Sequence, residues 1–206
     1  MSEFKPFPDL QMDVLKEVGN IGAGHAATAL SKLLDKQVDM MVPKVRMVPF
    51  EEIAESVGGI EQVVVAIFLR IEGETPGNMF FILTQESAKR LLKKIVGIEV
   101  EEEESYTEME LSALNEIGNI LAGSYLTSLA DFTNLNMQPT VPSLAIDMAG
   151  AILTYGLLQY GEMGDHALLI DTAFLEGKDE VEGHFFLIPD PESFDRIFAA
   201  LGVPSE

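Results

Sequence analysis

Apolar positions divide the chain into two long helical stretches and two pairs of strands. After Asp9, apolar residues recur at steps of three and four, which predicts a helix with one apolar face made of Leu15, Val18, Gly22, Ala26, Ala29 and Leu33. A second long helix is predicted to start at Thr107, because Thr107 followed by Glu110 fits a capping box. Four β-branched and aromatic runs bounded by Gly and Pro predict strands at 62–71, 77–84, 167–175 and 183–189.

The two long helices are copies of one another. The chain reads "EVGNIGAG" from Glu17 and "EIGNILAG" from Glu116, 99 positions later. Without a gap, Asp13 to Pro43 aligns with Ser112 to Pro142, and 11 of the 31 positions are identical. Average amino-acid usage would give roughly two identities, so the match is too dense to be compositional.

The similarity continues more weakly through the strand pairs. "VVVAIFLRIEG" from Val63 pairs with "ALLIDTAFLEG" from Ala167, and "FFIL" from Phe80 pairs with "FFLI" from Phe185. Each unit reads as a long helix, an extended segment around a proline, a shorter helix, two strands and a closing helix. We place the first repeat at about 9–100, a linker at about 100–106 and the second repeat at about 107–203.

These repeats predict one α/β domain spanning residues 1–206 with a pseudo-twofold axis. Each unit alone has few strands, so we expect the strands of both to join one mixed sheet, with the two long helices presenting their polar faces outward. The run Glu101 to Glu104 lies between the repeats. Consecutive carboxylates in an unstructured stretch point in different directions, which favours a solvated linker over a cation site.

The composition excludes several functions. A formal net charge of -21 disfavours binding to nucleic acid or to an anionic membrane. The same acidity fits either simple solubility or a basic protein partner. The absence of Cys excludes disulfides, thiolate metal sites and cysteine nucleophiles. With no signal peptide and no apolar run long enough to span a membrane, we expect a cytoplasmic protein without membrane insertion.

A polar stripe on each long helix is the strongest candidate site. Glu17 and Asn20 are three residues apart, so their side chains project from the same side of the helix, and Glu116 and Asn119 repeat that spacing. A solvated helix face would explain the polarity, but not why Glu and Asn stay the same while Lys16 has become Asn115. A small-residue surface for close helix packing, made of Gly19, Gly24 and the alanines, is an additional interpretation that explains the glycines but neither the Glu nor the Asn.

Other chemistries fit the sequence poorly. Gly19, Gly22 and Gly24 have the wrong spacing for a phosphate loop, and position 22 is Leu121 in the second copy. None of the three histidines belongs to a ligand-pair motif. A side-chain amide, however, can hold a water by both a donor and an acceptor, and a Glu one turn away could pair with a Lys of a phosphoprotein.

The spacing of these residues resembles a known family. "DVLKEVGN" followed after 22 residues by Pro43, and "SALNEIGN" followed after 22 residues by Pro142, resemble the duplicated D/S-x-x-x-E-x-x-N-x22-P signature of the CheC-type chemotaxis phosphatases. The resemblance covers essentially the whole chain. It implies hydrolysis of the aspartyl phosphate of the response regulator CheY at two sites. It assigns catalysis to Glu17, Asn20, Glu116 and Asn119, with Asp13, Ser112, Pro43 and Pro142 supporting the motif.

The resemblance also implies cofactors and partners. The chain itself would bind no cofactor, because Mg²⁺ would belong to the phosphorylated regulator. The receptor deamidase CheD would be a second partner. For "LAIDMAGAILTYGLLQYG" from Leu144, two interpretations stay open: a buried helix with Asp147 as its N-cap, or an exposed segment in which Asp147 contacts CheD. We expect a monomer, and a non-enzymatic adaptor that only docks these partners is the alternative function.

Overall fold

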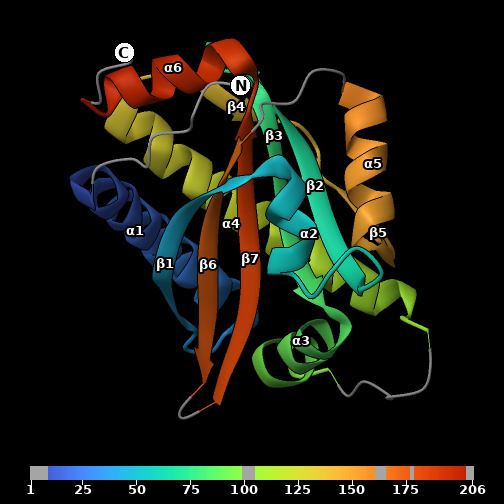
Figure 1. The fold of residues 1–206 in the computed structure, drawn as a ribbon. Coiled ribbons are helices and arrows are strands. Elements are labelled where there is room, and N and C mark those ends of the chain that lie inside the picture. Colours follow the sequence, from blue (N-terminus) through green and yellow to red (C-terminus); the bar gives the residue numbers. More distant parts are fainter. Residues whose placement is uncertain (1–8, 99–104, 161–165, 177–178, 203–206) are drawn as a thin grey trace.

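One antiparallel sheet runs through the molecule, with helices on both of its faces (Figure 1). The computed structural model describes residues 9–98, 105–160, 166–176 and 179–202. The run Glu101 to Glu104 therefore lies outside the described residues, and its predicted role as a linker stays a prediction.

The order of elements repeats once along the chain, as the sequence predicts. The helices are α1 (Asp9–Leu34), α2 (Ile53–Ser56), α3 (Gln85–Arg90), α4 (Glu108–Thr133), α5 (Ala149–Tyr160) and α6 (Pro191–Ala200), with a 3₁₀ turn η1 (Phe50–Glu52) and a π-helical segment η2 (Leu91–Val96). The strands are β1 (Asp39–Pro49), β2 (Val63–Gly73), β3 (Gly77–Thr84), β4 (Met137–Pro139), β5 (Ser143–Met148), β6 (His166–Glu176) and β7 (Asp179–Pro189).

The ends of the long helices follow from local chemistry. The capping box at the start of α4 is confirmed, because the backbone N–H of Thr107 donates to Glu110 Oε2 at 2.7 Å and the N–H of Glu110 donates to Thr107 Oγ1 at 3.3 Å. Just beyond α1 and α4, Asp35 and Asn134 have left-handed backbones with φ of 50° and 55°. These two residues are 99 positions apart, so both copies stop their helix in the same way.

The strands of the two repeats are exchanged within the sheet. Their order is β1-β6-β7-β3-β2-β4, and β5 also pairs with β2. The first repeat's β1 therefore lies on β6 of the second repeat, while β4 and β5 of the second repeat lie on β2 of the first. The prediction of one shared sheet is confirmed. The prediction that the sheet is mixed is wrong, because every strand pair among the described residues is antiparallel.

The register of the two outer ladders shows the pseudo-twofold directly. Lys44 of β1 lies opposite Asp171, and Ser143, 99 positions after Lys44, lies opposite Phe68. In both ladders the register breaks at the same place, around Val42 and Pro43 in one and between β4 and β5 in the other. Proline has no N–H to give to a ladder and favours such bulges.

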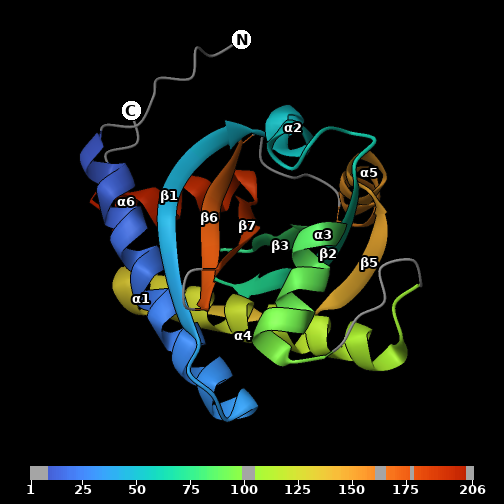
Figure 2. The same ribbon diagram turned by 90° about the horizontal axis from the view of Figure 1, so that it is seen from below.

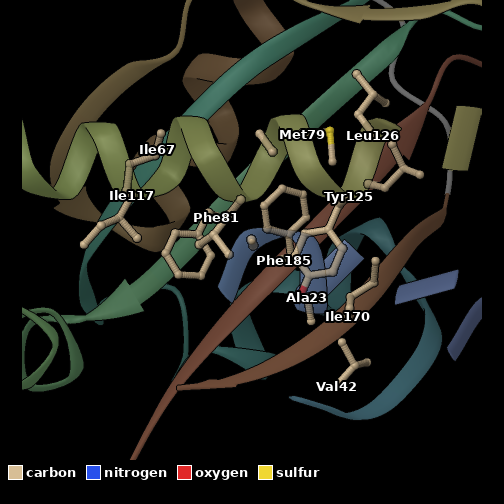
Figure 3. Close-up of a cluster of buried hydrophobic side chains, with 14 of the residues drawn as sticks. Ala23, Val42, Ile67, Met79, Phe81, Ile117, Tyr125, Leu126, Ile170 and Phe185 are labelled. Carbon is tan, nitrogen blue, oxygen red and sulfur yellow. The ribbon is translucent and has the colours of Figure 1, made fainter. Parts of the chain in front are cut away.

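Two apolar cores lie on opposite faces of the sheet. The larger lies between the sheet and α1, α4, α3, η2 and α6, and Figure 3 shows part of it, where α4 contributes Ile117, Tyr125 and Leu126. The smaller lies between the other face and α2 and α5. Figure 2, seen from below, shows α1 and α4 crossing beneath the sheet with α2 and α5 on its far side. The polar stripes of α1 and α4 consequently face away from the larger core.

Tyr125 of α4 contacts both α1 and the sheet where the two long helices cross. Its hydroxyl shares a hydrogen bond of 3.0 Å with Thr172 Oγ1 on β6, and burial raises the pKa of Tyr125 to about 12. A Cβ added to Gly22 of α1 would lie 2.7 Å from the Tyr125 ring and 3.0 Å from its Cα. Gly22 is thus required by the close approach of the helices, whereas the sequence analysis assigned small-residue packing to Gly19 and Gly24.

Candidate functional site

Glu17 and Asn20 lie one turn apart on the outward side of α1. Glu17 is exposed and Asn20 is half-buried. Asn20 Oδ1 accepts a hydrogen bond of 3.0 Å from the backbone N–H of Val42. Because Val42 is only 1% exposed, its N–H cannot turn to water, and Asn20 satisfies a buried donor of β1. The strand therefore fixes the orientation of the Asn20 amide.

The proline of the motif explains this contact. The register of β1 shifts between Met41 and Lys44, so Val42 and Pro43 form a bulge in the pairing with β6. The bulge turns the Val42 N–H toward α1, where Asn20 meets it across 22 positions of sequence. The spacing of 22 residues between the Asn and the Pro thus corresponds to a contact between a helix and the bulge of the next strand.

The second pair has different surroundings. Glu116 and Asn119 of α4 are both exposed. Val141, the counterpart of Val42, is 87% exposed, because the chain leaves the sheet between β4 and β5. The Asn119 side chain makes no hydrogen bond to a residue that the structure describes. Both the carbonyl and the NH₂ of this amide are therefore available to a partner.

A glycine follows each Asn by one turn, and Gly24 is exposed while Gly123 is half-buried. A Cβ added to Gly24 or Gly123 would meet nothing within 4 Å, unlike one added to Gly22. The prediction that Gly24 serves close helix packing is therefore wrong. A glycine inside a helix costs about 1 kcal/mol relative to alanine. Its presence at both positions leaves bare backbone beside each Asn, where another molecule can approach closely.

The supporting residues of the motif lie on the same long helices and on or between the strands that follow them. Asp13 and Ser112 are exposed, one turn before Glu17 and Glu116 on the same helix faces. Ser112 lines a groove together with Glu116. Pro43 is exposed at the bulge of β1, and its counterpart Pro142 is half-buried between β4 and β5. The prolines shape the strands beside each site.

A cluster of Arg46, Asp171 and His184 close to Pro43 was not predicted from the sequence. His184 Nδ1 lies 2.9 Å from Asp171 Oδ1, and Arg46 lies 3.3 Å from Asp171 Oδ2. Burial would raise the pKa of Asp171, but the hydrogen bond with His184 and the charge of Arg46 outweigh it and lower the pKa below its ordinary value. These residues and Pro43 line one pocket. Only the strand pairing brings them together, so no sequence spacing could reveal the cluster.

Asp147 is not the N-cap of a helix, which corrects one of the two interpretations of this segment. It lies in the edge strand β5 opposite Val64, and its Oδ1 accepts from the N–H of Met148 at 2.7 Å. Helix α5 begins two residues later at Ala149. Asp147 is exposed, between the exposed apolar side chains of Ile146 and Met148. A strand turns alternate residues outward, so the helical reading of this stretch failed where β5 precedes α5.

The described residues offer no place for a bound metal or a membrane span. No group of three His, Asp or Glu side chains within the described ranges could hold a metal ion. Of the helices in the part of the chain that the structure covers, none is long and apolar enough to cross a membrane.

Each of the two long helices, related by a pseudo-twofold within one chain, carries a Glu and an Asn one turn apart on its outward side. A model of the CheC-like family matches residues 10–47 and 109–146, which are the long helix and following strand of each repeat. The chain is 43% identical over 206 residues to the CheY-P phosphatase CheC of Bacillus subtilis (strain 168), covering 98% of this chain and 99% of that protein. The chain belongs to the CheC-like family.

More distant relatives share the sequence pattern or the fold. The flagellar motor switch phosphatase FliY of Bacillus subtilis (strain 168) is 30% identical over 145 residues, covering 70% of this chain and 38% of FliY. The crystal structure of Thermotoga maritima FliY superposes with a TM-score of 0.72 at 19% identity, covering 95% of this chain and 98% of that one. The FliM middle domain of H. pylori gives a TM-score of 0.67 at 11% identity, over 94% and 99% of the two chains. These two likenesses concern the fold alone.

Proposed function

We propose that this protein hydrolyses the aspartyl phosphate of phosphorylated CheY at two sites, Glu17 with Asn20 and Glu116 with Asn119. The proposal rests on one observation above all: both repeats carry the same Glu and Asn one turn apart on the outward side of a long helix, where Glu17, Glu116 and Asn119 are exposed and Asn20 is half-buried. The relative from Bacillus subtilis, similar over almost its whole length, is a CheY-P phosphatase.

The chemistry follows from what a side-chain amide can do. An amide has an acceptor and two donors on one rigid group, so Asn can hold a water in line with the phosphorus atom while the water attacks. The phosphorylated regulator supplies Mg²⁺, which neutralises charge on the phosphoryl group. The Glu pairs with a Lys of the regulator and fixes α1 or α4 against the reacting group. This chain forms no covalent bond to phosphorus.

The two sites contribute unequally in this account. Asn20 Oδ1 already accepts the Val42 N–H, which leaves the amide well oriented but with part of its acceptor capacity in use. Asn119 has its carbonyl and NH₂ both free of contacts to described residues. Because positioning a water uses a donor and an acceptor together, the second site accounts for more of the hydrolysis.

The lifetime of phosphorylated CheY tests the proposal against the adaptor alternative. Purified CheY is phosphorylated with a small phosphodonor in the presence of Mg²⁺, and phosphate release is followed with wild-type protein and with the Asn20→Ala, Asn119→Ala double variant. We expect acceleration by the wild type and none by the double variant. If the wild type binds phosphorylated CheY but leaves its lifetime unchanged, the protein is an adaptor.

A second partner follows from the surface around Asp147. Ile146 and Met148, its neighbours in the edge strand β5, and Tyr155 of α5 are 36%, 44% and 56% exposed. We propose that CheD docks on this surface, with Asp147 at the contact. Titration of CheD with Asp147→Lys tests the assignment, since unchanged affinity would contradict it. We further propose that the protein acts in the cytoplasm as a monomer, because the repeat supplies the twofold internally.

A further inference from the structure

An apolar groove borders the second site. It lies between the end of α1, the end of η2 and the start of α4, with an apolar lining from Leu33, Leu34, Val96, Met109 and Ile117, and Glu116 forms part of its wall. Leu33 and Met109 are 55% and 70% exposed. Large apolar side chains at this exposure contribute little to folding, and gathered around a groove they are typical of an interaction surface.

The side chain of Leu33 comes from the other repeat. Glu116 and Asn119 belong to α4, whereas Leu33 lies in the last turn of α1. The internal repeat relates Leu33 to Phe132 and Glu116 to Glu17, so the pseudo-twofold brings Phe132 to the first site as it brings Leu33 to the second. Phe132 is 50% exposed. At the neighbouring position Lys32 has become Asp131, while this position is apolar and exposed in both copies.

We infer that each site is composite: one repeat provides the Glu and Asn, and the other provides an apolar anchor against which the phosphorylated regulator packs. Leu33 is the anchor of the second site and Phe132 that of the first. The inference rests on the proposed function, since it takes the regulator as the occupant. Glu116 lies one turn from Asn119 and also lines the groove. A regulator bound with its phosphoryl group at Asn119 would therefore also lie against the groove. An apolar anchor beside a charged pair is the arrangement expected of a specific interface.

The pairing of strands between the two repeats places the anchor of one repeat beside the Glu and Asn of the other. The first repeat's β1 lies on β6 of the second repeat, and α1 contacts α4 along the crossing that Figure 2 shows. The end of each long helix is therefore held beside the beginning of the other. A separated repeat would have its Glu and Asn but no anchor.

The test combines an anchor substitution with the loss of one site. Leu33→Ser and Phe132→Ser are each introduced into Asn20→Ala, which keeps only the second site, and into Asn119→Ala, which keeps only the first. Steady-state phosphate release from phosphorylated CheY gives KM and kcat for each protein. We expect Leu33→Ser to raise KM about tenfold in the Asn20→Ala protein, which is the loss of about 1.4 kcal/mol of contact free energy, with kcat little changed. Phe132→Ser should raise KM mainly in the Asn119→Ala protein.

Controls separate this inference from simpler effects. Ile60→Ser removes an equally exposed apolar side chain, 62% exposed and outside the groove lining, and should leave KM unchanged. Thermal unfolding of every variant shows that the fold is kept. The inference is wrong if each anchor affects its own repeat's site, if both anchors affect both sites equally, or if neither changes KM. It is also wrong if Leu33→Ser dissociates a dimer in sedimentation, since a second copy would then occupy the groove. If the Asn20→Ala, Asn119→Ala double variant stays active, the proposed function fails instead.

Discussion

The two repeats hold the same Glu and Asn in different surroundings. In the first, Asn20 is half-buried and accepts a hydrogen bond from Val42 at a bulge of a long, continuous edge strand. In the second, the edge is broken into β4 and β5, Val141 is 87% exposed, and Asn119 is exposed. The duplication thus keeps the same Glu and Asn in both repeats, while the structure around them has diverged. As a result the Asn20 amide is held in one orientation, and the Asn119 amide has its hydrogen-bonding groups free of contacts to described residues.

The largest expected difference between the repeats lies at a glycine that both contain. A Cβ added to Gly118 would lie 2.7 Å from Ile67 Cγ2 and 2.9 Å from its Cβ, whereas one added to Gly19 would lie no closer than 3.5 Å to Val42. Gly118→Ala should lower the free energy of unfolding by about 1–3 kcal/mol through overpacking. Gly19→Ala should be neutral or stabilising, because alanine favours the helix. Urea unfolding measures both, and equal effects would contradict the difference in packing.

Asn20 and Asn119 should also differ in stability. Asn20→Ala removes the acceptor of a buried backbone N–H and should cost about 1–2 kcal/mol of unfolding free energy. Asn119→Ala changes an exposed side chain and should stay within about 0.5 kcal/mol of wild type. Urea unfolding of both variants, measured in one series with the wild type, gives the two changes in unfolding free energy. A cost for Asn119→Ala as large as that for Asn20→Ala would mean that the second amide is also structural.

Gly24 and Gly123 should show opposite effects on stability and activity. An added Cβ meets nothing within 4 Å at either position, so Gly24→Ala and Gly123→Ala should each stabilise the protein by up to about 1 kcal/mol. If these glycines leave room for the regulator, the same substitutions should raise KM for phosphorylated CheY. Thermal unfolding and phosphate release on the same preparations test both halves. Stabilisation with KM unchanged would remove the glycines from the docking surface.

The smallest expected effect on stability comes from Asp171 in β6. Asp171 lies opposite Lys44, and Phe68 lies opposite Ser143, the counterpart of Lys44. The strand register thus differs by one residue from the sequence alignment, which pairs Asp171 with Ile67. By this register an ion cluster in one repeat corresponds to an aromatic ring in the other. The pKa of Asp171 is lowered in the folded state from 3.8, so its contribution to stability is present above that value and is lost as the pH falls through the lowered pKa. Asp171→Asn should therefore flatten the acid side of the stability profile.

Unfolding midpoints measured from about pH 5 down to about pH 2.5 test that prediction. Asp195→Asn, at an exposed carboxylate on α6, is the matched control and should leave the slope unchanged. An identical acid slope for wild type and Asp171→Asn would mean that the cluster with His184 and Arg46 adds no pH-dependent stability.

The sequence predicts much of the fold because the duplication is dense and the strands are strongly patterned. The runs predicted at 62–71 and 77–84 correspond to Val63–Gly73 and Gly77–Thr84, and the run at 167–175 corresponds to His166–Glu176. The order of strands could not be predicted, because nothing in a single repeat says that β1 pairs with the other repeat's β6. The prediction of a mixed sheet was wrong, because the strand patterns do not show which strands are neighbours or whether those neighbours run parallel or antiparallel.

The helix positions of the candidate side chains were predicted from the sequence, but their contacts were not. Spacing places Glu17 with Asn20 and Glu116 with Asn119 on outward helix faces, and the structure confirms that placement. The bond from Val42 to Asn20 needs the bulge at Pro43, which depends on pairing with a strand more than 120 positions away. The expectation that Asp147 is a helix N-cap failed for a local reason, since an apolar run does not by itself distinguish a strand that leads into a helix from the helix.

The most direct test of unequal twin sites is the single-turnover rate of phosphate loss from Mg²⁺-loaded phosphorylated CheY, with saturating Asn20→Ala or Asn119→Ala protein. The account predicts that both singles remain faster than CheY alone and that Asn119→Ala is the slower, on the order of tenfold below wild type, because removing one positioned polar group is worth at least that much at its own site. A slower Asn20→Ala protein would reverse the assignment of the two sites. Equal rates in the two singles would contradict the unequal division of the hydrolysis, and a double variant as fast as the wild type would contradict a role for either amide in positioning water.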